Sequence, residues 1–136
     1  LDAEANYGWP YCYQTGVRIY FDPKFNAGGS KFDCGKVPEA LVPFPAHSSP
    51  LGLEYFDNSF LVALHGSTTK RLGRGYRVVR VSESKRVAED FITGFFEPPM
   101  KVNGRPADIF NFQNGFLLTD DYSGVVYYVY RKSAVR

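Results

Sequence analysis

The stretch "PLGLEYFDNSFLVALHGS" (residues 50–67) decides the fold, because the chain repeats it as "PADIFNFQNGFLLTDDYS" (residues 106–123). The two copies align without a gap at an offset of 56 residues. The matched pairs are Pro50 with Pro106, Leu53 with Ile109, Phe56 with Phe112, Asn58 with Asn114, Phe60 with Phe116, Leu61 with Leu117, and Ser67 with Ser123. The central turn also matches, as "DNS" in one copy and "QNG" in the other. The chain therefore contains an internal repeat.

Each copy opens a predicted antiparallel β-meander. The expected strands are 51–56, 60–65, 76–82 and 87–92 in the first copy, and 107–112, 116–120 and 125–131 in the second. The middle strands "FLVAL" and "FLLT" are apolar on both faces, as in a sheet that is covered on both sides. The segment "VAEDFITGF" (87–95) has some helix propensity, but a strand is favoured because the meander needs a fourth member.

A 56-residue repeat with four strands per unit is typical of β-propeller blades. The sequence therefore predicts an all-β partial β-propeller of about two blades. Residues 1–46 are expected to form a long loop region, 47–96 a blade and 97–136 an incomplete blade. A composition with 17% aromatic residues, 13 Gly, 9 Pro and one Met also favours strands and turns.

Composition also limits the partners. The net charge of +2 is too small to indicate nucleic acid or an anionic membrane surface, and no apolar run reaches transmembrane length. The basic segment "KRLGRGYRVVR" (70–80) reads as a solvated loop followed by a strand whose arginines point to different faces. No signal peptide is visible, and the chain opens on Leu1, so we expect a cut or processed product.

The two cysteines, Cys12 and Cys34, both lie in turn-rich sequence. No His stands near them at the spacing of zinc ligands. They are either two unpaired thiols or a disulfide, and the disulfide is favoured. By the chain-entropy model, a bond that closes the 12–34 loop stabilises the fold by roughly 3 kcal/mol. A structural disulfide would indicate an oxidising compartment.

Several motifs follow one another in the order of a known family: "NYGWPYC" (6–12), Cys34, "PAHSSPLGLEYF" (45–56), "FLVALHGS" (60–67), "GYRVVRV" (75–81), "DFITGF" (90–95), "GRPADI" (104–109) and "GFLLTDD" (115–121). Together they resemble the C-terminal part of the sorbosone/glucose dehydrogenase family. These proteins are six-bladed propellers that oxidise sugars with pyrroloquinoline quinone (PQQ) and calcium. The resemblance implies a Cys12–Cys34 bond and a periplasmic or secreted location.

The resemblance also suggests two cofactor-binding residues. The family places a cationic residue after the second strand of a blade, where this chain has His65, and an Arg before the first strand of the last blade, where it has Arg105. PQQ carries three carboxylates, and a guanidinium can hold a carboxylate bidentately. His65 departs from the Lys of the soluble glucose dehydrogenases. The alternative readings are a solvated turn residue for Arg105 and a histidine bonded to backbone for His65.

The family's general base and calcium ligands lie in segments upstream of the region that this chain resembles. No catalytic or metal-binding residue is therefore assigned, and PQQ and calcium are not expected to bind this chain alone. His47 follows the family pattern but carries no role. Asp120 and Asp121 are strand neighbours that face opposite sides, so they are not expected to form a catalytic pair. A role in a hairpin turn is favoured, and a cation site is the alternative.

Three functions remain open from the sequence. The chain is a truncated segment of a PQQ-dependent sugar dehydrogenase, a stand-alone self-associating module, or an oligomeric pseudo-propeller that binds a quinone or a sugar. End blades that lack a neighbour leave apolar faces uncovered. We therefore expect a homo-oligomer, with a dimer favoured over a three-copy ring.

Overall fold

The computed structural model describes residues 4–25 and 32–132. The chain divides into two compact units, with the boundary between Pro43 and Phe44. All regular structure in the described residues is β-strand or short 3₁₀ helix, so the prediction of an all-β chain is confirmed. No helix in this part of the chain is long and apolar enough to cross a membrane.

The first unit is a small disulfide-bonded hairpin. Its elements are β1 (Cys12–Thr15), β2 (Arg18–Phe21), η1 (Pro23–Phe25) and η2 (Cys34–Lys36). Cys12 and Cys34 are bonded, with Cα atoms 5.8 Å apart, so the predicted disulfide is confirmed. The sequence predicted only a loop here. It missed the hairpin because the strands are four residues long and their alternation of apolar and polar residues is correspondingly brief.

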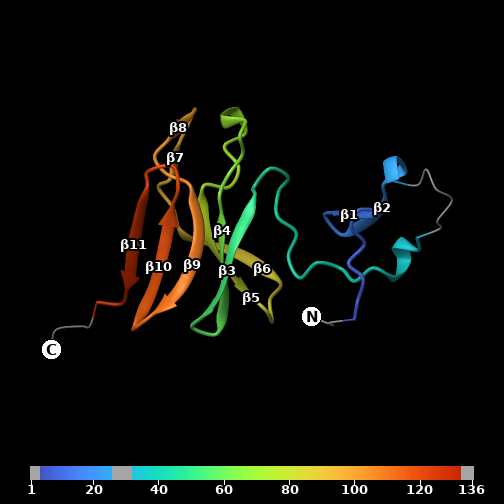
Figure 1. The fold of residues 1–136 in the computed structure, drawn as a ribbon, viewed down its shortest axis with the longest axis horizontal. Coiled ribbons are helices and arrows are strands. Elements are labelled where there is room, and N and C mark those ends of the chain that lie inside the picture. Colours follow the sequence, from blue (N-terminus) through green and yellow to red (C-terminus); the bar gives the residue numbers. More distant parts are fainter. Residues whose placement is uncertain (1–3, 26–31, 133–136) are drawn as a thin grey trace. The chain divides into compact units, whose positions relative to one another are not determined.

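The second unit contains the two repeats as antiparallel meanders. Sheet 1 consists of β3 (Pro50–Phe56), β4 (Ser59–Leu64), β5 (Arg77–Ser82) and β6 (Val87–Ile92). Sheet 2 consists of β9 (Pro106–Phe112), β10 (Gly115–Asp120) and β11 (Val125–Tyr130). All seven expected strands are present, and residues 87–92 form a strand rather than a helix. The two sheets lie side by side in Figure 1.

Short elements lie between the strands of the second unit. A 3₁₀ helix, η3 (Lys70–Leu72), lies between β4 and β5. A two-stranded hairpin, β7 (Phe96–Glu97) with β8 (Lys101–Val102), lies between β6 and β9 and was not predicted. The β10–β11 turn is short, so the offset between equivalent residues falls from 56 in β10 to 48 in β11. Phe60 pairs with Val81 in sheet 1, whereas Phe116 pairs with Val129 in sheet 2.

Each sheet has a front face and a back face, which strand pairing defines. The front face of sheet 1 carries Phe56, Leu61, Ala63 and Val78, and its back face carries Leu53, Tyr55, Phe60, Val62, Val79 and Val81. The equivalent front face of sheet 2 carries Phe110, Phe112, Leu117, Val126, Tyr128 and Tyr130, and its back face carries Ile109, Asn111, Phe116, Leu118 and Val129.

The core of the second unit lies between the front face of sheet 1 and the back face of sheet 2. Leu61, Ala63 and Val78 pack against Ile109, Phe116 and Leu118 in one buried cluster. The Phe56 and Phe116 rings meet edge to face, with their centroids 5.2 Å apart. The two repeats therefore stack head to tail, front to back, rather than face to face.

Candidate functional site

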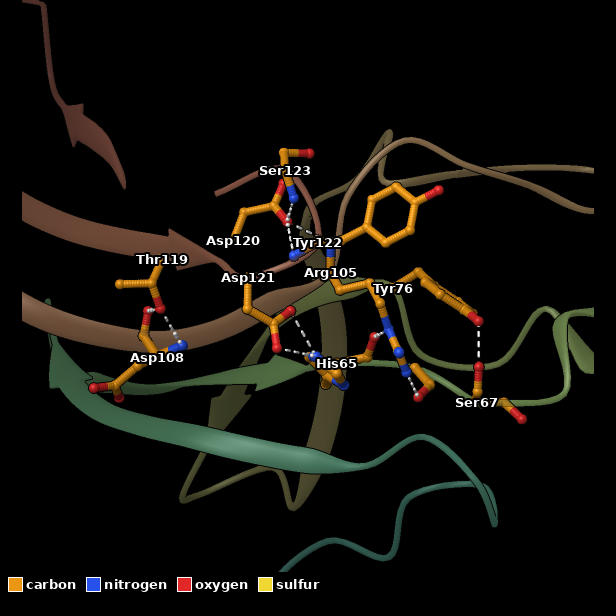
Figure 2. Close-up of polar contacts among 11 residues, drawn as sticks. His65, Ser67, Tyr76, Arg105, Asp108, Thr119, Asp120, Asp121, Tyr122 and Ser123 are labelled. Carbon is orange, nitrogen blue, oxygen red and sulfur yellow. Dashed lines mark hydrogen bonds and ion pairs between the residues drawn. The ribbon is translucent and has the colours of Figure 1, made fainter. Parts of the chain in front are cut away.

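The polar cluster in Figure 2 lies where the ends of three strands meet. His65 follows the end of β4, Arg105 precedes β9, and Asp120 and Asp121 stand at the end of β10. Both residues that the sequence nominated for cofactor binding, His65 and Arg105, are in this cluster. The structure thus brings together groups that are 40 or more residues apart in the chain.

His65 is paired with a carboxylate. Its Nε2 lies 2.8 Å and 3.0 Å from the two carboxylate oxygens of Asp121. The His65 side chain is 15% exposed and that of Asp121 is 60% exposed. The sequence left open a His65 ring that is bonded to backbone. The Nε2 atom is instead bonded to the side chain of Asp121. The partner was not predicted, although a signal existed: Asp121 is the residue that matches His65 at the 56-residue offset.

Arg105 ties the second repeat to the loop that follows β4. Its Nε donates to the His65 carbonyl at 3.2 Å and its Nη2 donates to the Gly66 carbonyl at 2.7 Å. The guanidinium carbon lies 5.7 Å from the centre of the Tyr76 ring, within the range of a cation–π contact. Arg105 is therefore a half-buried residue bonded to carbonyls, rather than a solvated turn residue.

The loop after β4, to which Arg105 donates, is fixed by further hydrogen bonds. The Tyr76 hydroxyl donates to the Ser67 carbonyl, and the Gly66 N–H donates to the Ser48 carbonyl at 2.9 Å. Gly66 has a φ of +97°, and a Cβ on it would come within 2.7 Å of the Tyr76 ring. This position needs glycine both for its backbone conformation and for the close approach of the aromatic ring.

Asp120 organises the other side of the cluster. Its Oδ1 accepts the backbone N–H groups of Arg105 at 2.9 Å, Tyr122 at 3.1 Å and Ser123 at 3.1 Å. Burial, the largest single influence, acts to raise the pKa of this carboxyl. The hydrogen bonds from Arg105, Ser123 and Tyr122 together outweigh it and hold the pKa below its ordinary value. The carboxylate thus serves the β10–β11 turn, as the sequence predicted.

Two further features shape the surroundings of Asp120. The pKa of Tyr127 is raised, first by burial and then by the charge of Asp120 and a hydrogen bond to it. A Cβ on Gly104 would lie 2.3 Å from the Asp120 carboxylate, so this position requires glycine. At the bulge between Leu118 and Asp120, the Thr119 hydroxyl accepts the Asp108 N–H at 2.9 Å.

The cluster does not by itself suit a tricarboxylate such as PQQ. The Nε and Nη2 of Arg105, one of the two edges through which a guanidinium can hold a carboxylate bidentately, are engaged by carbonyl oxygens. The Asp121 carboxylate beside His65 would repel another carboxylate. No group of three or more His, Cys, Asp and Glu side chains gathers at metal-binding distance within the described residues. His47 lies exposed on the loop before β3.

Comparison with known proteins gives a distant relative and no family. The chain is 26% identical over 142 residues to an uncharacterized protein of Borreliella burgdorferi. The match covers 93% of this chain and 36% of that protein, so the chain spans about a third of the relative's length. No protein family model matches the chain. No solved structure matches it either.

Proposed function

We propose that this chain is a two-repeat segment of a β-propeller that resembles the sorbosone/glucose dehydrogenases, and that it is a scaffold segment without catalysis of its own. The observation that carries the proposal is the head-to-tail stacking of the two repeats. Leu61 on the front of sheet 1 packs against Phe116 on the back of sheet 2. Repeats related by rotation about a common axis, as in a propeller, stack in this way.

The polar cluster supports a position near such an axis. His65 and Asp121 occupy the same position in their repeats and are hydrogen-bonded to each other. Asn111 likewise donates from its side chain to the carbonyl of its own equivalent, Tyr55, at 2.9 Å. Equivalent points of rotated copies can touch only where they lie close to the rotation axis. The cluster is thus the candidate inner wall of the proposed ring.

The chemistry of the cluster supports a structural rather than a catalytic role for this segment. Arg105 donates hydrogen bonds to backbone carbonyls, and Asp120 accepts them from backbone N–H groups. His65 is hydrogen-bonded to the Asp121 carboxylate. These bonds join the loop after β4, in the middle of the first repeat, to the start of β9 and the end of β10 in the second. A quinone or calcium site would need groups that this cluster does not offer, so the chain alone is proposed to bind neither.

Titration with PQQ and calcium, read by absorbance and by dye-linked oxidation of glucose and sorbosone, tests the catalytic part. We expect no saturable absorbance change and no turnover. Turnover that disappears in an Arg105→Ala variant would overturn the proposal and would support a complete site. The stacking is tested separately by NMR: contacts are expected between Leu61 and Phe116, and none between Leu117 and Phe60 of the same molecule.

We also propose a periplasmic or secreted location. The Cys12–Cys34 disulfide supports it, because structural disulfides persist in oxidising compartments. Alkylation of the native, unreduced protein should label no thiol at these two positions. Two alkylated cysteines in protein recovered from its natural compartment would contradict the proposal.

The second candidate is a stand-alone module that associates with itself, as a homo-oligomer or a pseudo-propeller with a sugar or quinone ligand. The observation in its favour is the front face of sheet 2, which exposes Phe110, Phe112, Val126, Tyr128 and Tyr130. The sequence favours a dimer over a three-copy ring, and the simplest dimer is two-fold symmetric. The head-to-tail stacking inside the chain supports a different geometry for that association.

A further inference from the structure

The exposed front face of sheet 2 is a continuous aromatic surface. Tyr128 stacks on Tyr130 with ring centroids 5.0 Å apart, and Phe112 meets Tyr128 edge to face at 5.7 Å. Phe110 is 63% exposed on the same face. The equivalent front face of sheet 1 is buried under the back face of sheet 2. An apolar sheet face of this kind indicates an interaction surface.

We propose that the front face of sheet 2 binds the back face of sheet 1 in a second copy of this chain. The back face of sheet 1 is equivalent to the surface that already covers a front face within the molecule. Only its β3 side remains available: Leu53 is 62% exposed and Tyr55 is exposed as well, whereas Val62, Val79 and Val81 on the same face are already buried within the chain. The association is head to tail, so each copy presents one surface of each kind.

The side chains at the proposed contact complement each other. The contacts between copies are predicted from the internal ones. Each residue of the first repeat is replaced by its equivalent in the second repeat, and each residue of the second repeat by its equivalent in the first repeat of the next copy. The edge-to-face pair of Phe56 and Phe116 becomes Phe112 with Phe60 of the second copy. The hydrogen-bonded pair of Glu54 and Asn111 becomes Phe110 with Tyr55 of the second copy. A polar pair is thus replaced by an aromatic pair.

The cluster at the strand ends complements itself in the same way. The internal pair of His65 and Asp121 becomes Asp121 of one copy beside His65 of the next. Imidazole and carboxylate groups would therefore alternate around the axis, and no two like groups would be neighbours. If the proposed six-repeat propeller holds, three copies close the ring. That closed number rests on the proposed function, whereas the head-to-tail contact rests on the packing alone.

Complementation between two surface variants tests the proposal. Phe110→Asp disables the front face of sheet 2, and Leu53→Asp disables the back face of sheet 1. Wild-type protein at tens of micromolar should be oligomeric by light scattering. Each variant alone should be monomeric, with the apparent Kd raised at least about tenfold. An equimolar mixture of the two variants should form a 1:1 dimer that does not grow, since one working surface of each kind remains.

The controls separate this geometry from the alternatives. Met100→Asp places the same charge at an exposed position between β7 and β8 and should leave association unchanged. Val126→Asp and Tyr55→Asp repeat the front and back tests if either first variant unfolds on heating before the wild type. A monomeric wild type, or Leu53→Asp protein that still dimerises by itself, would overturn the proposal. Neither result would change the NMR contacts that test the stacking within one chain.

Discussion

The two sheets carry matching side chains in different surroundings. Leu61 of sheet 1 is 0% exposed, whereas Leu117, its equivalent in sheet 2, is half-buried. On the opposite face the order reverses, because Phe116 of sheet 2 is 1% exposed and its equivalent Phe60 is half-buried. The burial of a side chain in these sheets therefore depends on which face meets the neighbouring repeat, and not on the type of side chain.

The largest expected effect on stability comes from a substitution on the buried back face of sheet 2. Phe116→Ala should lower the free energy of unfolding by about 3–5 kcal/mol, because it removes a ring from the centre of the core and leaves a cavity. Phe60→Ala is the matched control, with the same chemistry at the equivalent position. It should cost clearly less in urea unfolding monitored by circular dichroism. Equal losses for the two variants would contradict the head-to-tail assignment of faces.

The two units can be compared in the same way, because the disulfide lies entirely within the first unit. Cys12→Ser combined with Cys34→Ser should cost the first unit about 3 kcal/mol, since a 22-residue separation is no longer constrained in the unfolded state. Hydrogen exchange should become faster at β1 and β2 only. The amides of β4 and β10 serve as the internal control. Faster exchange in those central strands as well would mean that the units do not unfold independently.

The strands were predictable from the sequence because their signal is local and repeated. "FLVAL" and "FLLT" are apolar runs bounded by turn residues, and each supports the other through the 56-residue offset. The β1–β2 and β7–β8 hairpins were missed because strands of two to four residues carry too little pattern. Sequence periodicity also separates the two faces of a sheet, but it does not say which of them a neighbour covers.

The candidate site was predictable only in part. His65 and Arg105 were nominated by resemblance, and they do lie together. Their partners are backbone carbonyls and Asp121, and the choice of a carbonyl by a guanidinium depends on how two loops meet in space. The role of Asp120 was visible as a turn residue, whereas its bond to the Arg105 N–H, from 15 residues away, was not.

Asp120→Asn should produce the next effect, a loss of about 1–3 kcal/mol, because a buried acceptor of three backbone N–H groups loses its charge. The pKa of Asp120 is lowered in the fold, so its carboxylate stabilises the protein above the unfolded-state pKa. That contribution is lost as pH falls through the folded-state pKa. The difference between wild type and variant should therefore shrink in acid. A difference that stays constant from neutral pH to pH 2 would contradict this role.

The smallest effect concerns His65 and Asp121, which occupy equivalent positions in the two repeats and are hydrogen-bonded to each other. His65→Asp should destabilise the chain by less than about 1 kcal/mol, because it puts two carboxylates face to face at a partly exposed site. Adding Asp121→His to that variant exchanges the two residues between equivalent positions. If the positions are interchangeable, the exchanged protein should recover most of the loss in chemical denaturation. A double variant no more stable than the sum of the single variants predicts would show that the two strand ends are not equivalent, and would remove the alternating His–Asp arrangement from the assembly proposed above.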